Sequence, residues 1–168
     1  MKTWISAAVM TTLLLATAAQ ANPAEIAAPK GAKLLLAATA DGVQIYSCEA
    51  HDRLYSWSFK SPEAALFDAD GREIIKHGAG PSWTAEDGTS VVGELVAKSD
   101  APRAGAIPWL LLKAKNVQGP GALGKSAYIR RIDTIGGAAP GTGCDAGHVG
   151  AVARMRYSAV YEFYSAGE

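Results

Sequence analysis

Residues 34–48 read Leu-Leu-Leu-Ala-Ala-Thr-Ala-Asp-Gly-Val-Gln-Ile-Tyr-Ser-Cys, which is two short apolar runs on either side of an Asp-Gly pair. Asp-Gly in this setting is a strong hairpin signal, because both residues tolerate the positive φ that a tight turn requires. The segment therefore predicts two antiparallel strands, 34–39 and 43–48, joined by a turn at 40–42.

The same pattern of short runs and turn residues continues along the chain. Residues 54–59 alternate in polarity, and 65–67 and 73–77 flank a second turn, Asp68-Ala-Asp-Gly71. Further runs at 91–97, 109–115 and 157–164 are typical of strands. No long segment keeps apolar residues at helical spacing, and 18 glycines and 8 prolines disfavour helix interiors. The pattern predicts an all-β fold, a single antiparallel β-sandwich or flattened barrel of about 8–10 strands.

The N-terminus has the features of a secretory signal. A basic start, Met1-Lys-Thr3, precedes the apolar stretch 4–18 and the small-residue site Ala19-Gln-Ala21. We expect a signal peptide over 1–21, cut after Ala21, and a periplasmic or secreted protein; an uncleaved signal anchor is the alternative. Residues 22–31 are expected to be a flexible lead-in and 32–168 a single β domain, with no membrane span after cleavage.

Charge and cysteine content narrow the possible functions. Lys+Arg and Asp+Glu both number 16, so the net charge is zero, which argues against nucleic acid as a partner. Two cysteines, Cys48 and Cys144, in an exported chain usually form one disulfide, although a metal pair or a reactive thiol is the alternative. Cys144, Asp145 and His148 are too few for a metal site if Cys144 is bridged, so we expect no metal and no cofactor.

The segment Gly119-Pro-Gly-Ala-Leu-Gly-Lys-Ser126 matches the phosphate-loop pattern at every position. Such a loop needs several backbone N–H groups converging on a phosphate and a helix that starts at the Lys-Ser pair. Pro120 removes one N–H, and Gly136-Gly137 soon follows. The segment therefore predicts a glycine-rich loop between two strands.

The segment His77-Gly-Ala-Gly-Pro-Ser-Trp83 is the best candidate for a binding site. Its tight turn could present an imidazole and an indole together, with Trp83 stacking on a sugar or another flat ligand and Asp87 and Lys113 as polar anchors. The alternative is that Trp83 packs in the core and His77 ends an edge strand, because single aromatic residues in β proteins are more often core.

Seven motifs, taken in order, resemble the secreted domain-of-unknown-function family 3455 (DUF3455). They are Val43-Gln-Ile-Tyr-Ser-Cys48, Leu66-Phe-Asp-Ala-Asp-Gly71, His77-Gly-Ala-Gly-Pro-Ser-Trp83, Asp87-Gly-Thr-Ser-Val-Val-Gly93, Ile107-Pro-Trp-Leu-Leu-Leu-Lys113, Tyr128-Ile-Arg-Arg131 and Gly143-Cys-Asp145. The resemblance implies a small exported protein and supports pairing of Cys48 with Cys144. His77, Trp83, Asp87 and Lys113 fall on its motif positions, whereas Arg130 stands where relatives tend to carry Gln.

Three functions are consistent with these observations. The first is a binding module for an envelope saccharide or another small ligand, which would be the partner held near Trp83. The second is a small secreted hydrolase that uses His77 as a general base, oriented by Asp87 or Asp145. The third is a passive structural or envelope stress protein with a disulfide-locked surface. The first is the expectation carried forward.

Overall fold

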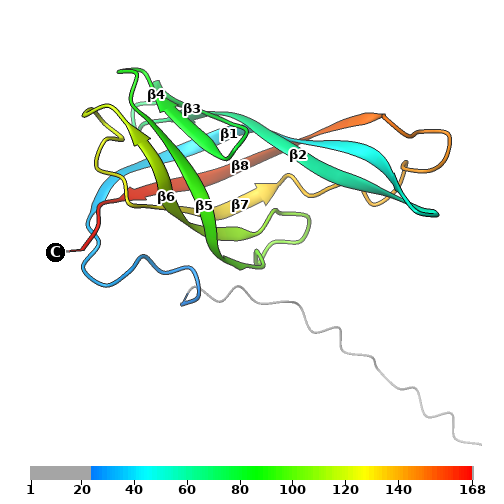
Figure 1. Ribbon diagram of the computed structural model, residues 1–168, viewed down its shortest axis with the longest axis horizontal. Coiled ribbons are helices and arrows are strands. Elements are labelled where there is room, and N and C mark those ends of the chain that lie inside the picture. The colour runs from blue at the N-terminus through cyan, green and yellow to red at the C-terminus, as the bar shows by residue number, and fades with distance from the viewer. Residues whose placement is uncertain (1–23, 168) are drawn as a thin grey trace, which may run out of the picture.

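The computed structural model describes residues 24–167, which form eight β-strands and no helix (Figure 1). The strands are β1 (Leu34–His51), β2 (Leu54–Phe67), β3 (Glu73–Gly78), β4 (Ser82–Ala85), β5 (Ser90–Ser99), β6 (Trp109–Gln118), β7 (Tyr128–Gly136) and β8 (Val152–Tyr164). The all-β prediction is confirmed. Residues 24–167 include no helix that could span a membrane, and the predicted signal peptide lies outside the described residues.

Each strand pairs in antiparallel fashion with the next, and β8 returns to pair with β1, so one sheet closes into a ring. The ring is not a regular barrel, because its strands differ greatly in length. The three longest, β1, β2 and β8, have 18, 14 and 13 residues, whereas β4 has four. Figure 1 shows these long strands running past the shorter ones to form an extension on the right.

The predicted hairpin at Asp41-Gly42 is wrong, because β1 runs straight through both residues. Gly42 pairs with Ala64 on β2 and with Tyr157 on β8, so strands on both sides hold this position extended. A Cβ at Gly42 would collide with the Glu63 carbonyl oxygen and the Ala64 side chain. Here glycine therefore permits a close approach of two strands and not a turn.

The second predicted turn, at Asp68–Gly71, is confirmed between β2 and β3. The Asp68 carboxylate accepts hydrogen bonds from the backbone N–H groups of Asp70 and Arg72, at 3.0 and 2.9 Å. Gly71 has a φ of 79°, which its missing side chain makes inexpensive. Local side-chain bonding of this kind stabilises a turn without help from distant strands.

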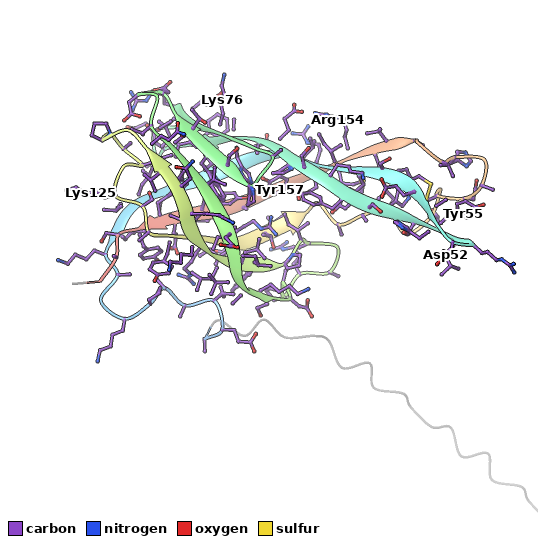
Figure 2. The ribbon with its side chains drawn as sticks, in the orientation of Figure 1. Asp52, Tyr55, Lys76, Lys125, Arg154 and Tyr157 are labelled. Carbon is purple, nitrogen blue, oxygen red and sulfur yellow. A yellow bond between two sulfur atoms is a disulfide. The ribbon has the colours of Figure 1, made fainter. Side chains whose placement is uncertain are left out.

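The interior of the ring is filled by residues that alternate along each strand. Direct cross-strand pairing places one such row on β8, β1, β2, β3 and β4, because opposed residues point to the same face. This row consists of Tyr157, Gly42, Ala64, His77 and Trp83. Tyr157 is labelled near the middle of the molecule in Figure 2. The two small residues in the row leave room for the large side chains on either side.

The residues just before β1 pack on the outside of the ring. Ile26 is fully buried, and its carbonyl oxygen accepts a hydrogen bond of 2.8 Å from Nε of Arg130 on β7. The same arginine forms an ion pair of 2.8 Å with Glu162 on β8. The described part of the expected lead-in is therefore anchored at Ile26.

The predicted disulfide between Cys48 and Cys144 is present. It joins β1 to the β7–β8 loop, at the extension and beyond the ring. The same loop is held by a 2.9 Å hydrogen bond from Nε1 of Trp57 to the Thr142 carbonyl. The backbone also pairs there, because Gly150 N–H donates to the Cys48 carbonyl at 2.9 Å.

Candidate ligand-binding cavity

A cavity of about 530 Å³, partly open to solvent, lies beside the packed core of the ring. This volume falls in the range of roughly 300–1,000 Å³ that is typical of small-molecule sites. The lining residues come from all eight strands and from two connecting segments. They are Gln44, Tyr46, Phe59, Lys60, Pro62, His77, Gly80, Pro81, Trp83, Lys98, Pro108, Leu110, Leu112, Arg131 and Tyr161.

One wall of the cavity is a stack of aromatic rings. His77 and Trp83 are direct cross-strand neighbours on β3 and β4, and their rings lie parallel with centroids 4.5 Å apart. Tyr161 of β8 meets both rings edge-on, at 5.1 Å from His77 and 5.7 Å from Trp83. Such contacts fix the rings beyond what burial alone provides. The two rings lie together, but Trp83 is 1% exposed and packs in the core, which is the alternative that the sequence left open for it.

His77 is uncharged at neutral pH. The pKa of its imidazole is lowered to about 4, chiefly by burial; a hydrogen bond to the backbone opposes this shift, and the nearby Arg131 charge adds to it. That bond joins Nδ1 to the Ser82 carbonyl at 2.8 Å. Because a carbonyl only accepts, Nδ1 carries the proton, and Nε2 is left as an acceptor.

A second row of inward side chains runs across β5, β6, β7 and β8 and meets the aromatic wall at Tyr161. Each member of the row is the direct cross-strand partner of the next: Lys98, Leu110, Arg131 and Tyr161. Arg131 is only 8% exposed. Its Nε and Nη2 both donate to the Pro108 carbonyl, at 3.1 and 2.8 Å. This fork of two bonds holds the guanidinium in one orientation.

The cavity also has two buried polar side chains besides Arg131. Gln44, at 3% exposure, hydrogen-bonds to the Tyr157 hydroxyl. Trp83 is 1% exposed, and its indole N–H has no hydrogen-bond partner among the described residues, which is unusual for a buried donor.

The remaining predicted anchors lie away from this cavity. Lys113 sits between Glu94 and Tyr128 on the outer face of the sheet, because its neighbour Leu112 points inward. Asp87 lies on the β4–β5 turn, where its carboxylate accepts from the Thr89 side chain and from the Ala122 N–H at 2.7 Å. The structure thus brings together two of the four predicted site residues.

Asp87 explains why the glycine-rich loop does not form a phosphate site. The loop joins β6 to β7, as expected, and its N–H groups are already bound within the protein. Ala122 donates to the Asp87 carboxylate and Leu123 donates to the Thr89 hydroxyl at 3.2 Å. A Cβ at Gly121 would collide with this carboxylate. In Figure 2, Lys125 of this loop lies at the opposite end of the molecule from Tyr55 and Asp52.

We expect Thr89→Val to destabilise the protein by about 1–3 kcal/mol, because the buried N–H of Leu123 then loses its acceptor. Thr89 is itself 3% exposed, so water does not replace the lost hydroxyl. Urea unfolding of the variant measures the change. Thr89→Ser, which retains the hydroxyl, serves as the control, and equal stability of both variants with the natural protein would contradict the role of this bond.

The hydrolase arrangement is not assembled in residues 24–167. Asp87 is bound to the glycine-rich loop, and Asp145 accepts a 2.7 Å hydrogen bond from Nδ1 of His148 in the β7–β8 loop. The only hydrogen bond of the His77 ring among the described residues goes to a backbone carbonyl. Among residues 24–167, no three or more His, Cys, Asp or Glu side chains form a group that could hold a metal ion.

Arg131 was not identified from the sequence as a site residue, although a signal was present. Once 128–136 is taken as a strand, Ile129 and Arg131 share a face, and a charged residue beside a buried isoleucine is unusual. From the sequence alone, the spacing of Ile129 and Ile132 suits a helix as well as a strand, so the sequence does not define which face of residues 128–136 points inward.

Neither a comparison with curated proteins nor one with solved structures gives a match. The family described as "Protein of unknown function (DUF3455)" matches residues 29–165, which span all eight strands, the cavity and the disulfide. With most of its length covered by that match, the chain belongs to the DUF3455 family.

Proposed function

We propose that the protein is an exported binding module that holds a small, largely apolar molecule inside its ring of strands. The observation that carries the proposal is the cavity of about 530 Å³, whose lining is mainly aromatic and aliphatic and includes the buried, oriented side chain of Arg131. A predominantly apolar wall with a few fixed polar groups is the usual design of a small-molecule site. The predicted signal peptide and the disulfide support a periplasmic or secreted location.

The form of the cavity favours an apolar ligand over an envelope saccharide. Trp83 is 1% exposed, and one face of its indole is covered by His77, so it offers no open platform at the surface. A sugar would require many polar partners, whereas Leu110, Leu112 and Tyr161 contribute mostly apolar surface. Removal of apolar ligand surface from water supplies binding energy of roughly 25 cal/mol per Å².

A neutral fluorescent probe tests whether this cavity accepts ligands. N-phenyl-1-naphthylamine, which becomes bright in apolar surroundings, should bind the oxidised protein. Leu110→Trp, which fills part of the cavity from β6, should abolish or greatly weaken that binding. At about 100 times its Kd the probe should also add about 2.7 kcal/mol to the free energy of unfolding.

The control is Leu54→Trp, because Leu54 is 75% exposed at the tip of the β1–β2 hairpin and does not line the cavity. It should bind the probe as the natural protein does. Leu110→Phe is a milder variant if the larger side chain disturbs folding, and circular dichroism checks the fold. Equal probe binding by the Leu110 variants and the natural protein, or no binding by any of them, would contradict the proposal.

A further inference from the structure

Arg131 is a buried cation with no anionic partner among residues 24–167. Its side chain makes hydrogen bonds only to the Pro108 carbonyl, and none of the ion pairs in the described chain includes it. Charged side chains are almost never this buried unless they are paired, because removal from water is costly. An arginine retained in such a place requires an explanation beyond packing.

The guanidinium is held so that it can serve a second partner. Nε and Nη2 are bound to Pro108, while Nη1 has no hydrogen-bond partner among the described residues. Arg131 also lines the cavity, so the unbound side of its planar fork is available to a ligand. A fixed guanidinium suits the planar oxygen pair of a carboxylate, which can accept two parallel bonds.

The charges around the cavity favour an anion. No aspartate or glutamate is among the cavity-lining residues, whereas Lys60, Lys98 and Arg131 are. Lys60 is paired with Glu49, so its charge is balanced. Lys98 has no ion pair in the described chain and lies in the same cross-strand row as Arg131. A cationic ligand would meet repulsion here, and an anionic one attraction.

The rest of the lining is mainly apolar. Phe59, Pro81 and Leu110 line the cavity without being fully buried, so they offer contacts for an apolar body. The ligand that fits is therefore anionic at the end that meets Arg131 and apolar at the other.

Resting on the proposed function, we infer that the ligand is a small amphiphilic carboxylate whose carboxylate group pairs with Arg131 inside the ring. Its apolar body lies against Phe59, Pro81 and Leu110. Lys98 attracts the anion from the more exposed end of the same row. The carboxylate distinguishes this ligand class from neutral lipids, amines and saccharides.

Displacement of N-phenyl-1-naphthylamine by three ligands with the same alkyl chain tests the inference. Decanoate should displace the probe at concentrations roughly 10- to 100-fold lower than 1-decanol, the range expected for one well-formed charged hydrogen bond. Decylammonium should be the weakest competitor. In Arg131→Gln the advantage of decanoate over decanol should disappear while the neutral probe still binds.

Two further variants isolate the role of the charge. Arg131→Lys keeps the cation but loses the planar fork, so it should retain part of the preference for decanoate. Arg156→Gln removes an arginine that is exposed on the outer face of β8 and pairs with Asp41, and it should behave as the natural protein. Probe binding and circular dichroism show whether each variant is folded.

The outcomes distinguish this inference from the function on which it rests. If the probe binds but decanol competes as well as decanoate, or if Arg131→Gln leaves the preference intact, the carboxylate assignment is overturned and the binding module remains. If the probe does not bind to the natural protein, the proposed function itself is overturned.

Discussion

Removal of the Cys48–Cys144 disulfide should lower the free energy of unfolding by about 4–5 kcal/mol. The bridge closes a loop with a sequence separation of 96, and the chain-entropy relation gives roughly this value for a loop of about 100 residues. Because domains are typically stable by only about 5–15 kcal/mol, the reduced protein should be marginal. Urea unfolding of the double variant Cys48→Ser, Cys144→Ser against the oxidised protein measures the difference.

Hydrogen exchange shows which part of the protein loses stability first when the disulfide is removed. The N–H groups of Cys48 and Gly150 donate across the junction of β1 with the β7–β8 loop, to the carbonyls of Ala151 and Cys48, so their hydrogen exchange should accelerate in the double variant. Amides on β5 and β6, which lie away from the disulfide, should exchange faster only because the free energy of global unfolding is lower. An unfolding midpoint that does not move on reduction would contradict the prediction.

The sequence predicted the local turns that carry their own chemistry. Asp68 bonds its turn with its own carboxylate, so no distant strand is needed to form it. The Asp41-Gly42 pair has the same turn propensity, but β2 and β8 both pair with it and keep it extended. That outcome depends on closure of the sheet between the first and last strands, which is a long-range event that a short window of sequence does not contain.

The sequence predicted only part of the candidate site, because some of its residues meet through local pairing and others only through the register of the whole ring. His77 and Trp83 lie six residues apart and meet across one short hairpin, so their association could be predicted from the local sequence. Arg131 reaches the same cavity from a strand 48 residues after Trp83, and only the register of the whole ring shows that it points inward. Asp87 follows Trp83 closely in the sequence, yet its carboxylate accepts a hydrogen bond from the backbone N–H of Ala122 in the β6–β7 loop.

Between pH 6.5 and about 4 the protein should lose about 3 kcal/mol of its free energy of unfolding through His77. Burial holds the pKa of this imidazole at about 4 in the folded state, whereas the unfolded chain binds the proton near pH 6.5. In this window the unfolded state therefore carries more protons, and stability falls as the pH falls. Well above pH 6.5 both states are neutral and the contribution is fully present.

The variant His77→Asn tests this assignment, because its amide can donate to the Ser82 carbonyl in place of Nδ1 but does not titrate. It should be less stable at neutral pH, since the stack on Trp83 is lost, yet its stability should change much less between pH 6.5 and 4.

His51→Gln is the matched control, because His51 is exposed and lies outside the cavity, and this variant should keep the loss of stability that we assign to His77. The carboxylates with hydrogen-bond partners, including Asp87 and Asp145, have lowered pKa values, so their loss falls at the acid end of the scale and does not imitate the His77 signal. A steep decline in stability that persists in His77→Asn would assign the proton uptake to another group and would contradict a neutral, buried His77.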